Sequence, residues 1–195
     1  MFGTGTRLVV AGAVAATSLV GVAAPAEAKA KRCVLGTWVL TSFTAVSKGP
    51  GYKHTMDGLE GTVLRIKKNS IMYNFTGSKR GDISGKANGH PYQIWHLLSG
   101  KLTVKAKVTG STKGKVNVKP RTATGGATRT EIYIASGQKI RTGPFNMVKE
   151  HKTGTWEATT PFYSSYTCKG KRLRMDSKTG ANGSSTKVTR IFKRL

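Results

Sequence analysis

Apolar and polar residues alternate through most of this 195-residue chain, and this pattern constrains the fold more than any other feature. The clearest case is segment 101–108, in which every second residue is apolar: Leu102, Val104, Ala106 and Val108. A period of two is typical of a β-strand with one face in water. No segment shows a convincing recurrence of apolar residues at helical spacing. The sequence therefore predicts an all-β protein.

Turn-forming residues divide these alternating runs into about eight to ten short strands. Segments 62–67 and 71–75 are expected to form a hairpin, and the Gly-, Ser- and Lys-rich segment 77–89 is expected to be an exposed loop. In segment 37–43 apolar residues fall on both faces, so this strand is expected to be apolar on both sides. Many short antiparallel strands favour a β-barrel or a β-sandwich.

The first 28 residues are expected to be a secretory signal peptide. Arg7 precedes an apolar run over residues 8–22, and Ala26-Glu27-Ala28 supplies the small-x-small pattern of a cleavage site. The alternative, a membrane anchor, is disfavoured because the run is shorter than the roughly 20 residues of a spanning helix. Residues 29–195 are therefore predicted to form a single secreted domain, monomeric and without a transmembrane segment.

Cys33 and Cys168 are the two cysteines of the chain. In an exported protein such a pair is expected to form a disulfide, and two free buried thiols are the alternative. The bond would hold the first strand of the mature domain beside its last strands. A closed sheet follows from that arrangement.

Short motifs at both ends resemble the calycins, the group that contains lipocalins and fatty-acid-binding proteins. Gly36-Thr37-Trp38 matches their opening motif, and Thr189-Arg190-Ile191-Phe192 matches the closing one. Secreted bacterial lipocalin-like proteins also carry Tyr-x-Cys-x-Gly-x-x-Leu, which stands here at 166–173. The resemblance implies an antiparallel up-and-down β-barrel closed by one disulfide, with Arg190 packed over Trp38. The middle lipocalin motif, Thr-Asp-Tyr, is absent, so no ligand-binding residue is carried over.

Positive charge is the strongest anomaly of the composition. The chain has 33 Lys and Arg against 8 Asp and Glu, a formal net charge of +25, far above the roughly 2–8 suited to a small soluble domain. Such a field attracts polyanions, although lysine is also common on solvated outer faces of sheets. The candidate contact residues are Lys101, Lys105, Lys107, Lys115, Lys119, Lys171, Arg172 and Arg174.

Catalytic and metal-binding motifs do not stand out. The chain has no Gly-x-Ser-x-Gly, His-Glu-x-x-His or phosphate-loop motif, and its histidines lack ligand spacing. We therefore predict a non-enzymatic protein without metal or cofactor. One possible function is a lipocalin-like carrier of a small hydrophobic ligand. The other is a cationic protein that binds an anionic polymer or surface, such as cell wall, nucleic acid or acidic glycan, with antimicrobial action as one use. No motif predicts sequence-specific nucleic-acid recognition.

Overall fold

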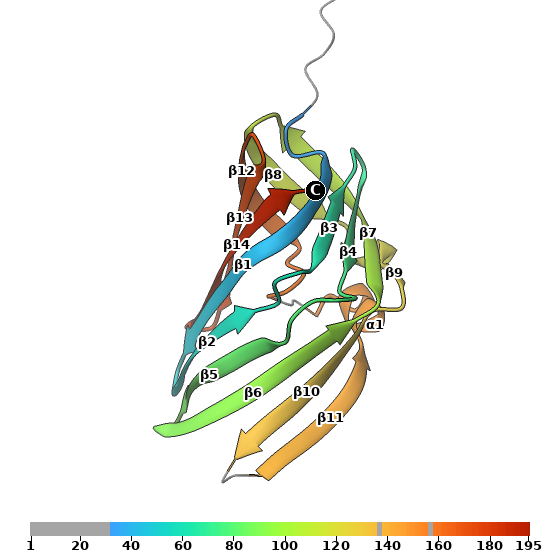
Figure 1. Ribbon diagram of the computed structural model, residues 1–195. Coiled ribbons are helices and arrows are strands. Elements are labelled where there is room, and N and C mark those ends of the chain that lie inside the picture. The colour runs from blue at the N-terminus through green and yellow to red at the C-terminus, as the bar shows by residue number, and fades with distance from the viewer. Residues whose placement is uncertain (1–31, 136–137, 156–157) are drawn as a thin grey trace, which may run out of the picture. The chain divides into compact units, whose positions relative to one another are not determined.

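The computed structural model describes residues 32–135, 138–155 and 158–195, and these are mostly β-strand (Figure 1). The predicted signal peptide, residues 1–28, lies outside the described residues. One group of strands comprises β1 (Gly36–Gly49), β3 (Val63–Ile66), β4 (Ser70–Asn74), β7 (Lys101–Gly110), β8 (Lys113–Val118), β12 (Tyr163–Lys169), β13 (Arg172–Ala181) and β14 (Ser184–Arg194). The other elements are β2 (Tyr52–Gly58), β5 (Gly81–Ala87), β6 (His90–Ser99), the 3₁₀ turn η1 (Pro120–Thr122), β9 (Thr124–Gly125), β10 (Thr128–Ala135), β11 (Gln138–Asn146) and helix α1 (Met147–Lys152).

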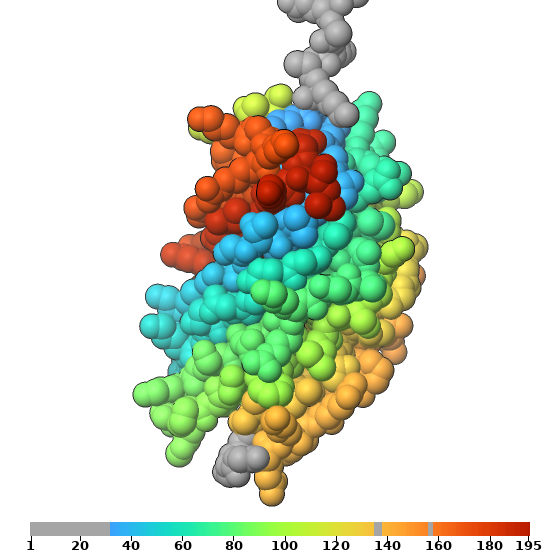
Figure 2. Space-filling view, in the orientation of Figure 1, coloured from blue at the N-terminus to red at the C-terminus, as the bar shows by residue number. Residues whose placement is uncertain are grey.

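The first group closes into an eight-stranded antiparallel barrel. Its order is β1, β3, β4, β7, β8, β12, β13 and β14, and β14 pairs with β1 to complete the ring. Each barrel strand therefore lies beside the one that precedes it in the chain, which is up-and-down topology. Figure 2 shows the atoms of β1, in blue, against those of the last strand, in red. A disulfide joins Cys33 to Cys168 on β12. The predicted barrel and disulfide are both confirmed.

The barrel is closed at one end and split at the other. The first part of β1, residues 36–39, pairs with β3, whereas residues 44–49 pair with β2. From β2 an open sheet continues through β5, β6 and β10 to β11, across the lower part of Figure 1. Within the described residues, β11 pairs with β10 alone. We call this five-stranded extension of β1 the open sheet.

A β-bulge in β1 turns its apolar side chains to one side. Trp38 and Leu40 are buried before the bulge and Phe43 after it, so the inward positions change from even to odd numbers. The register against β14 shifts between Leu40 and Ser42, which identifies Thr41 as the extra residue. The prediction that this strand is apolar on both faces is therefore wrong.

Strand β5 occupies most of the segment 77–89 that was predicted to be an exposed loop. Its inward positions include Ile83 together with the glycines at 81 and 85. A Cβ atom at Gly85 would lie 2.4 Å from the Cβ of His54 on β2. Glycine is therefore required by the close approach of the two strands, and the low hydrophobicity of the segment does not mean exposure.

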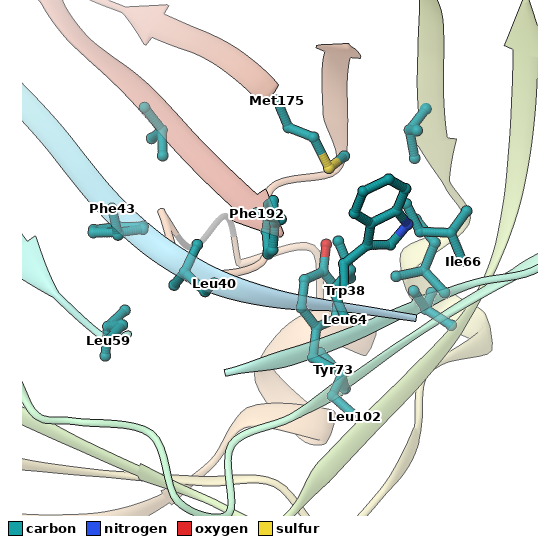
Figure 3. Close-up of a cluster of buried hydrophobic side chains, with 14 of the residues drawn as sticks. Trp38, Leu40, Phe43, Leu59, Leu64, Ile66, Tyr73, Leu102, Met175 and Phe192 are labelled. Carbon is teal, nitrogen blue, oxygen red and sulfur yellow. The ribbon is translucent and has the colours of Figure 1, made fainter. Parts of the chain in front are cut away.

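Buried side chains fill the closed end of the barrel (Figure 3). They come from strands all around the ring, and each is at most 3% exposed: Trp38, Leu64, Ile66, Ile71, Tyr73, Leu102, Val104, Met175 and Phe192. The alternating residues of segment 101–108 contribute as predicted, with the apolar set inside and the lysines outside. This packed core is the rigid support for the outer surface described below.

Trp38 and Arg194 close the floor of the barrel. The indole Nε1 of Trp38 donates a hydrogen bond of 3.0 Å to the carbonyl oxygen of Val34. The guanidinium carbon of Arg194 lies 4.2 Å from the centre of the Trp38 ring. The same guanidinium donates to the carbonyl oxygens of Cys33 and Leu35. The indole ring of Trp38, the guanidinium of Arg194 and the disulfide of Cys33 therefore hold the turn before β1 against the end of the barrel.

The arginine over Trp38 is thus not Arg190, as the family resemblance implied. Across the β1–β14 pair, Trp38 faces Arg194, whereas Arg190 faces Phe43. Four residues along a strand correspond to about 13 Å, so Arg190 lies too far along β14 to cover the indole. It is buried, 1% exposed, and donates to the Ser164 hydroxyl at 2.6 Å. Arg190 is therefore a buried residue of the barrel interior and not a surface charge.

Acid is expected to destabilise the fold through His151 on α1. This side chain is 1% exposed, its ring is 4.8 Å from that of Phe162, and burial lowers its pKa to about 4. The unfolded chain takes up this proton near pH 6.5 and the folded chain only near pH 4, so stability is lost as the pH falls between these values. The loss by about pH 4.5 is roughly 2–3 kcal/mol.

We expect His151→Leu to remove that part of the pH dependence, because leucine has no proton to take up. Urea denaturation at about pH 7.5 and about pH 4.5 measures the difference for both proteins. An equal acid-induced loss in the variant and the wild type would contradict the assignment to His151.

Candidate functional site

Basic residues on the outer face of the closed barrel are the first candidate site. On β7, Lys105 and Lys107 are exposed and alternate with the buried Val104 and Ala106. On the neighbouring strand β8, Lys115 is also exposed. Adjacent strands lie about 4.8 Å apart, so the period-two pattern gathers these lysines on one wall.

Two hollows on this wall are lined by basic and neutral residues. The first has a volume of about 410 Å³ and lies over β7 and the β3–β4 turn, and the second has about 680 Å³ and lies between η1 and α1. Lys119 lines both, so the two hollows are adjacent. Within the part of the chain that the structure describes, none of the residues that line them is acidic. We call their basic residues the basic groove: Arg32, Lys68, Lys105, Lys107, Lys119, Arg121 and Lys152.

Backbone hydrogen bonds fix the two lysines at the centre of the groove. The amide of Lys119 donates to the carbonyl oxygen of Lys105 at 2.8 Å. The Thr122 hydroxyl accepts from the amide of Lys105 at 2.9 Å and donates to the carbonyl oxygen of Lys119 at 2.7 Å. At the edge of the groove, the Arg32 guanidinium donates to the Val108 carbonyl oxygen at 2.7 Å. The positive charges therefore stand on a rigid frame.

Ion pairs within the described residues leave the charges of the groove unneutralised. In residues 32–135, 138–155 and 158–195, ion pairs join Arg80 to Asp82, Arg174 to Asp176, and His96, Arg129, Glu131 and Glu150 to one another. No residue of the basic groove takes part in these pairs. Seven like charges on one surface create a positive potential that attracts anions.

The other predicted contact residues lie outside the groove. Lys101 is at the start of β7, and Lys115 lies opposite Thr109 on the outer wall. The remaining predicted residues, Lys171, Arg172 and Arg174, lie on β13 and the turn before it, and Arg174 is paired with Asp176 at 2.8 Å. Two strand spacings, about 10 Å, separate β8 from β13. The predicted set is therefore divided between the groove and a neighbouring patch.

Four groove residues were not among the predicted contacts: Arg32, Lys68, Arg121 and Lys152. Arg121 could have been added, because it lies within the acid-free window of residues 83–130. Lys68 comes to the groove because the β3–β4 turn lies against β7, where the Ala106 amide donates to the Asn69 carbonyl oxygen at 2.9 Å. No local pattern contains that contact.

A cavity inside the open sheet is the second candidate site. Its volume is about 180 Å³, which is below the roughly 300–1,000 Å³ of sites for drug-sized ligands. Its lining is mixed: Ala45, Met56, Ile83 and Ala158 are apolar, and Ser47, His54, His96, Thr159 and Thr186 are polar. The open end therefore offers an interior space that combines apolar and hydrogen-bonding walls.

A buried ionic network lies beside this cavity. The Nε2 atom of His96 is 3.4 Å from Oε1 of Glu131, and the Nε atom of Arg129 is 2.9 Å from the same oxygen. The Tyr133 hydroxyl donates to the other oxygen of Glu131 at 2.7 Å. The hydrogen bond from His96, with support from Tyr133 and Arg129, lowers the pKa of Glu131 to about 2. This carboxylate is therefore ionised at neutral pH.

Metal sites, membrane-spanning helices and known relatives are three further indicators of function. The described part of the chain contains no group of three or more His, Cys, Asp or Glu side chains able to hold a metal ion, and none of its helices has the length and apolar character to cross a membrane. No protein-family model, curated protein or solved structure matches the chain. The closed eight-stranded barrel agrees with a calycin-like fold, and lipocalin identity stays a prediction.

Proposed function

We propose that this protein is a non-enzymatic binding protein for an anionic polymer, and that the basic groove is its contact surface. The observation that carries the proposal is the gathering of seven basic residues around two adjacent hollows, with no acidic residue among the described residues of their lining. The net charge of +25 extends the attraction beyond the groove. A repeating anion can engage several of these charges at once, whereas a small anion can engage only a few.

The side chains of the groove favour recognition of charge density over recognition of bases. Five of the seven basic residues are lysines, which act as point charges without the planar geometry that arginine offers to a single phosphate or carboxylate. Among the described residues, no aromatic side chain lines either hollow, so these residues supply none of the stacking platforms typical of single-stranded nucleic-acid sites. These features favour a polymer with repeating phosphate or sulfate groups, such as an anionic cell-wall polymer or glycan.

The alternative hypothesis, a carrier of a bulky hydrophobic ligand, has less support than polymer binding. Side chains fill the closed end of the barrel, and the cavity of the open end is about 180 Å³. The outer surface, by contrast, offers two hollows of more than twice that volume.

Charge reversal in the groove is expected to abolish polymer binding. The test compares wild-type protein with Lys105→Glu/Lys107→Glu/Lys119→Glu in titrations with a heparin oligosaccharide over a range of salt concentrations. We expect the variant to bind at least about 100-fold more weakly, at roughly 1 kcal/mol for each lysine removed. The slope of log affinity against log salt should fall by about three, one for each lost contact.

A matched variant controls for net charge. Lys48, Lys53 and Lys86 are exposed neighbours on β1, β2 and β5, away from the groove. Reversing all three changes the net charge by the same amount, and we expect it to weaken binding by less than about tenfold. Equal losses in the two variants would show that the groove is not the contact surface. Binding by the wild type that does not depend on salt would rule out the polyanion function.

A further inference from the structure

We propose that the cavity of the open sheet binds one small, neutral, hydroxylated aromatic ring. The cavity is on the inner face of the sheet and is separate from the basic groove on the outside. Its volume of about 180 Å³ is close to the roughly 150 Å³ of an apolar cavity that accepts benzene. Ala45, Met56 and Ile83, all buried, form much of its apolar wall.

Two unsatisfied polar atoms distinguish this cavity from an ordinary packing gap. The Nδ1 atom of His96 and the hydroxyl of Thr159 are buried and have no hydrogen-bond partner within the described ranges, and both residues line the cavity. The other hydroxyls of the lining satisfy each other, since those of Ser47 and Thr186 are 2.9 Å apart. Unpaired buried polar groups are unfavourable, so a ligand that reaches both atoms would be stabilised.

The chemistry of these two atoms selects the ligand. The ionised carboxylate of Glu131 lies against Nε2 of His96, and in the tautomer that donates from Nε2 to this carboxylate, Nδ1 is an acceptor. The Thr159 hydroxyl can donate. A phenolic hydroxyl complements both, because it donates to Nδ1 and accepts from Thr159. An anionic ligand would meet the lone pair of Nδ1 with the Glu131 charge close behind it.

An apolar row leads from the cavity to the edge of the open sheet. In an antiparallel sheet, residues directly opposite each other share a face. The strand registers place in one such row Met56, Ile83, Ile94, Tyr133 and Ile140. Met56 and Ile83 line the cavity, whereas Tyr133 is 38% and Ile140 55% exposed. Exposed apolar side chains that continue into a cavity are typical of a ligand's entry path.

Titration of the full-length protein with phenol tests the site, with toluene as the probe that lacks the hydroxyl. Protein NMR measures the affinity for each probe and identifies the residues whose signals shift on binding. We expect phenol to bind with a Kd of about 1 mM or tighter and to shift the signals of His96 and Thr159. Toluene should bind about tenfold more weakly, because it leaves both polar atoms unpaired.

Two variants and one control make the test specific. Ala45→Leu fills the cavity and should abolish binding, and Thr159→Val keeps the shape but removes the hydroxyl, so it should weaken phenol about tenfold. Thr41→Val is a matched change at an exposed position on the bulge and should leave binding unchanged. Circular dichroism confirms folding of each variant, and Thr159→Val preserves the test if Ala45→Leu does not fold.

Several outcomes would overturn the site. These are no saturable binding of phenol to folded wild type up to about 10 mM, equal affinity for toluene and phenol, or binding within about twofold of wild type in Thr159→Val. The charge-reversed groove variant should bind phenol normally, so failure of the polymer proposal and failure of this one can be told apart.

Discussion

Removal of the Cys33–Cys168 disulfide is expected to lower the free energy of unfolding by about 5 kcal/mol. The two cysteines are 135 residues apart in sequence, and cross-linking so long a loop restricts the unfolded chain strongly. The chain-entropy model gives about 4.7 kcal/mol for a loop of 100 residues and slightly more for this one. Because a whole domain is stable by only about 5–15 kcal/mol, the loss would be a large part of the total.

The measurement compares urea denaturation of the oxidised wild type with that of Cys33→Ala/Cys168→Ala. Alanine is the better replacement, because Cys168 is buried and a serine hydroxyl there would need a partner. Wild type treated with a thiol reductant is the control and should unfold at nearly the same urea concentration as the variant. A loss below about 1 kcal/mol would show that the Trp38–Arg194 contacts hold the turn without the disulfide.

The barrel could be predicted because its signals are local. Segment 101–108 alternates without interruption, and the two cysteines mark strands that must come together. The open sheet was harder to foresee because β5 has glycine where strands usually carry larger residues. In β1, the extra residue Thr41 changes which side chains face inward: even-numbered residues do so before the bulge and odd-numbered residues after it. A bulge of this kind is set by pairing with distant strands, which no local pattern records.

The residues of the candidate sites also fall into two groups. Some could be predicted from local sequence patterns, and others are brought to the site by contacts between distant segments. Composition pointed to Lys105, Lys107 and Lys119 as contact residues, and all three line the basic groove. The groove also needs Arg32 and Lys152, which are far apart in sequence and come to the same face only in the folded protein. The interior cavity depends on buried atoms left without partners, and these can be recognised only in three dimensions.

Substitution of Trp38 is expected to be nearly as damaging as loss of the disulfide. Trp38 is fully buried, and truncation of a buried tryptophan to alanine costs about 3–5 kcal/mol through lost packing and the cavity left behind. The change also removes the surface beneath Arg194. Arg194→Met should cost about 2–3 kcal/mol, because the cation–π contact and the hydrogen bonds to two backbone carbonyl oxygens are lost while the apolar stem remains.

A double-mutant cycle separates the contact between these two residues from their individual packing. Once Trp38→Ala has removed the ring, Arg194→Met should cost less than it does in the wild type, with a coupling of about 1 kcal/mol or more in urea denaturation. Lys193→Met is the matched control, because Lys193 is the exposed neighbour of Arg194, and it should change stability by less than about 0.5 kcal/mol. If the costs of the two substitutions simply add, the cation does not stabilise the floor through the indole. Arg194 would then act only through the carbonyl oxygens of the turn that carries Cys33.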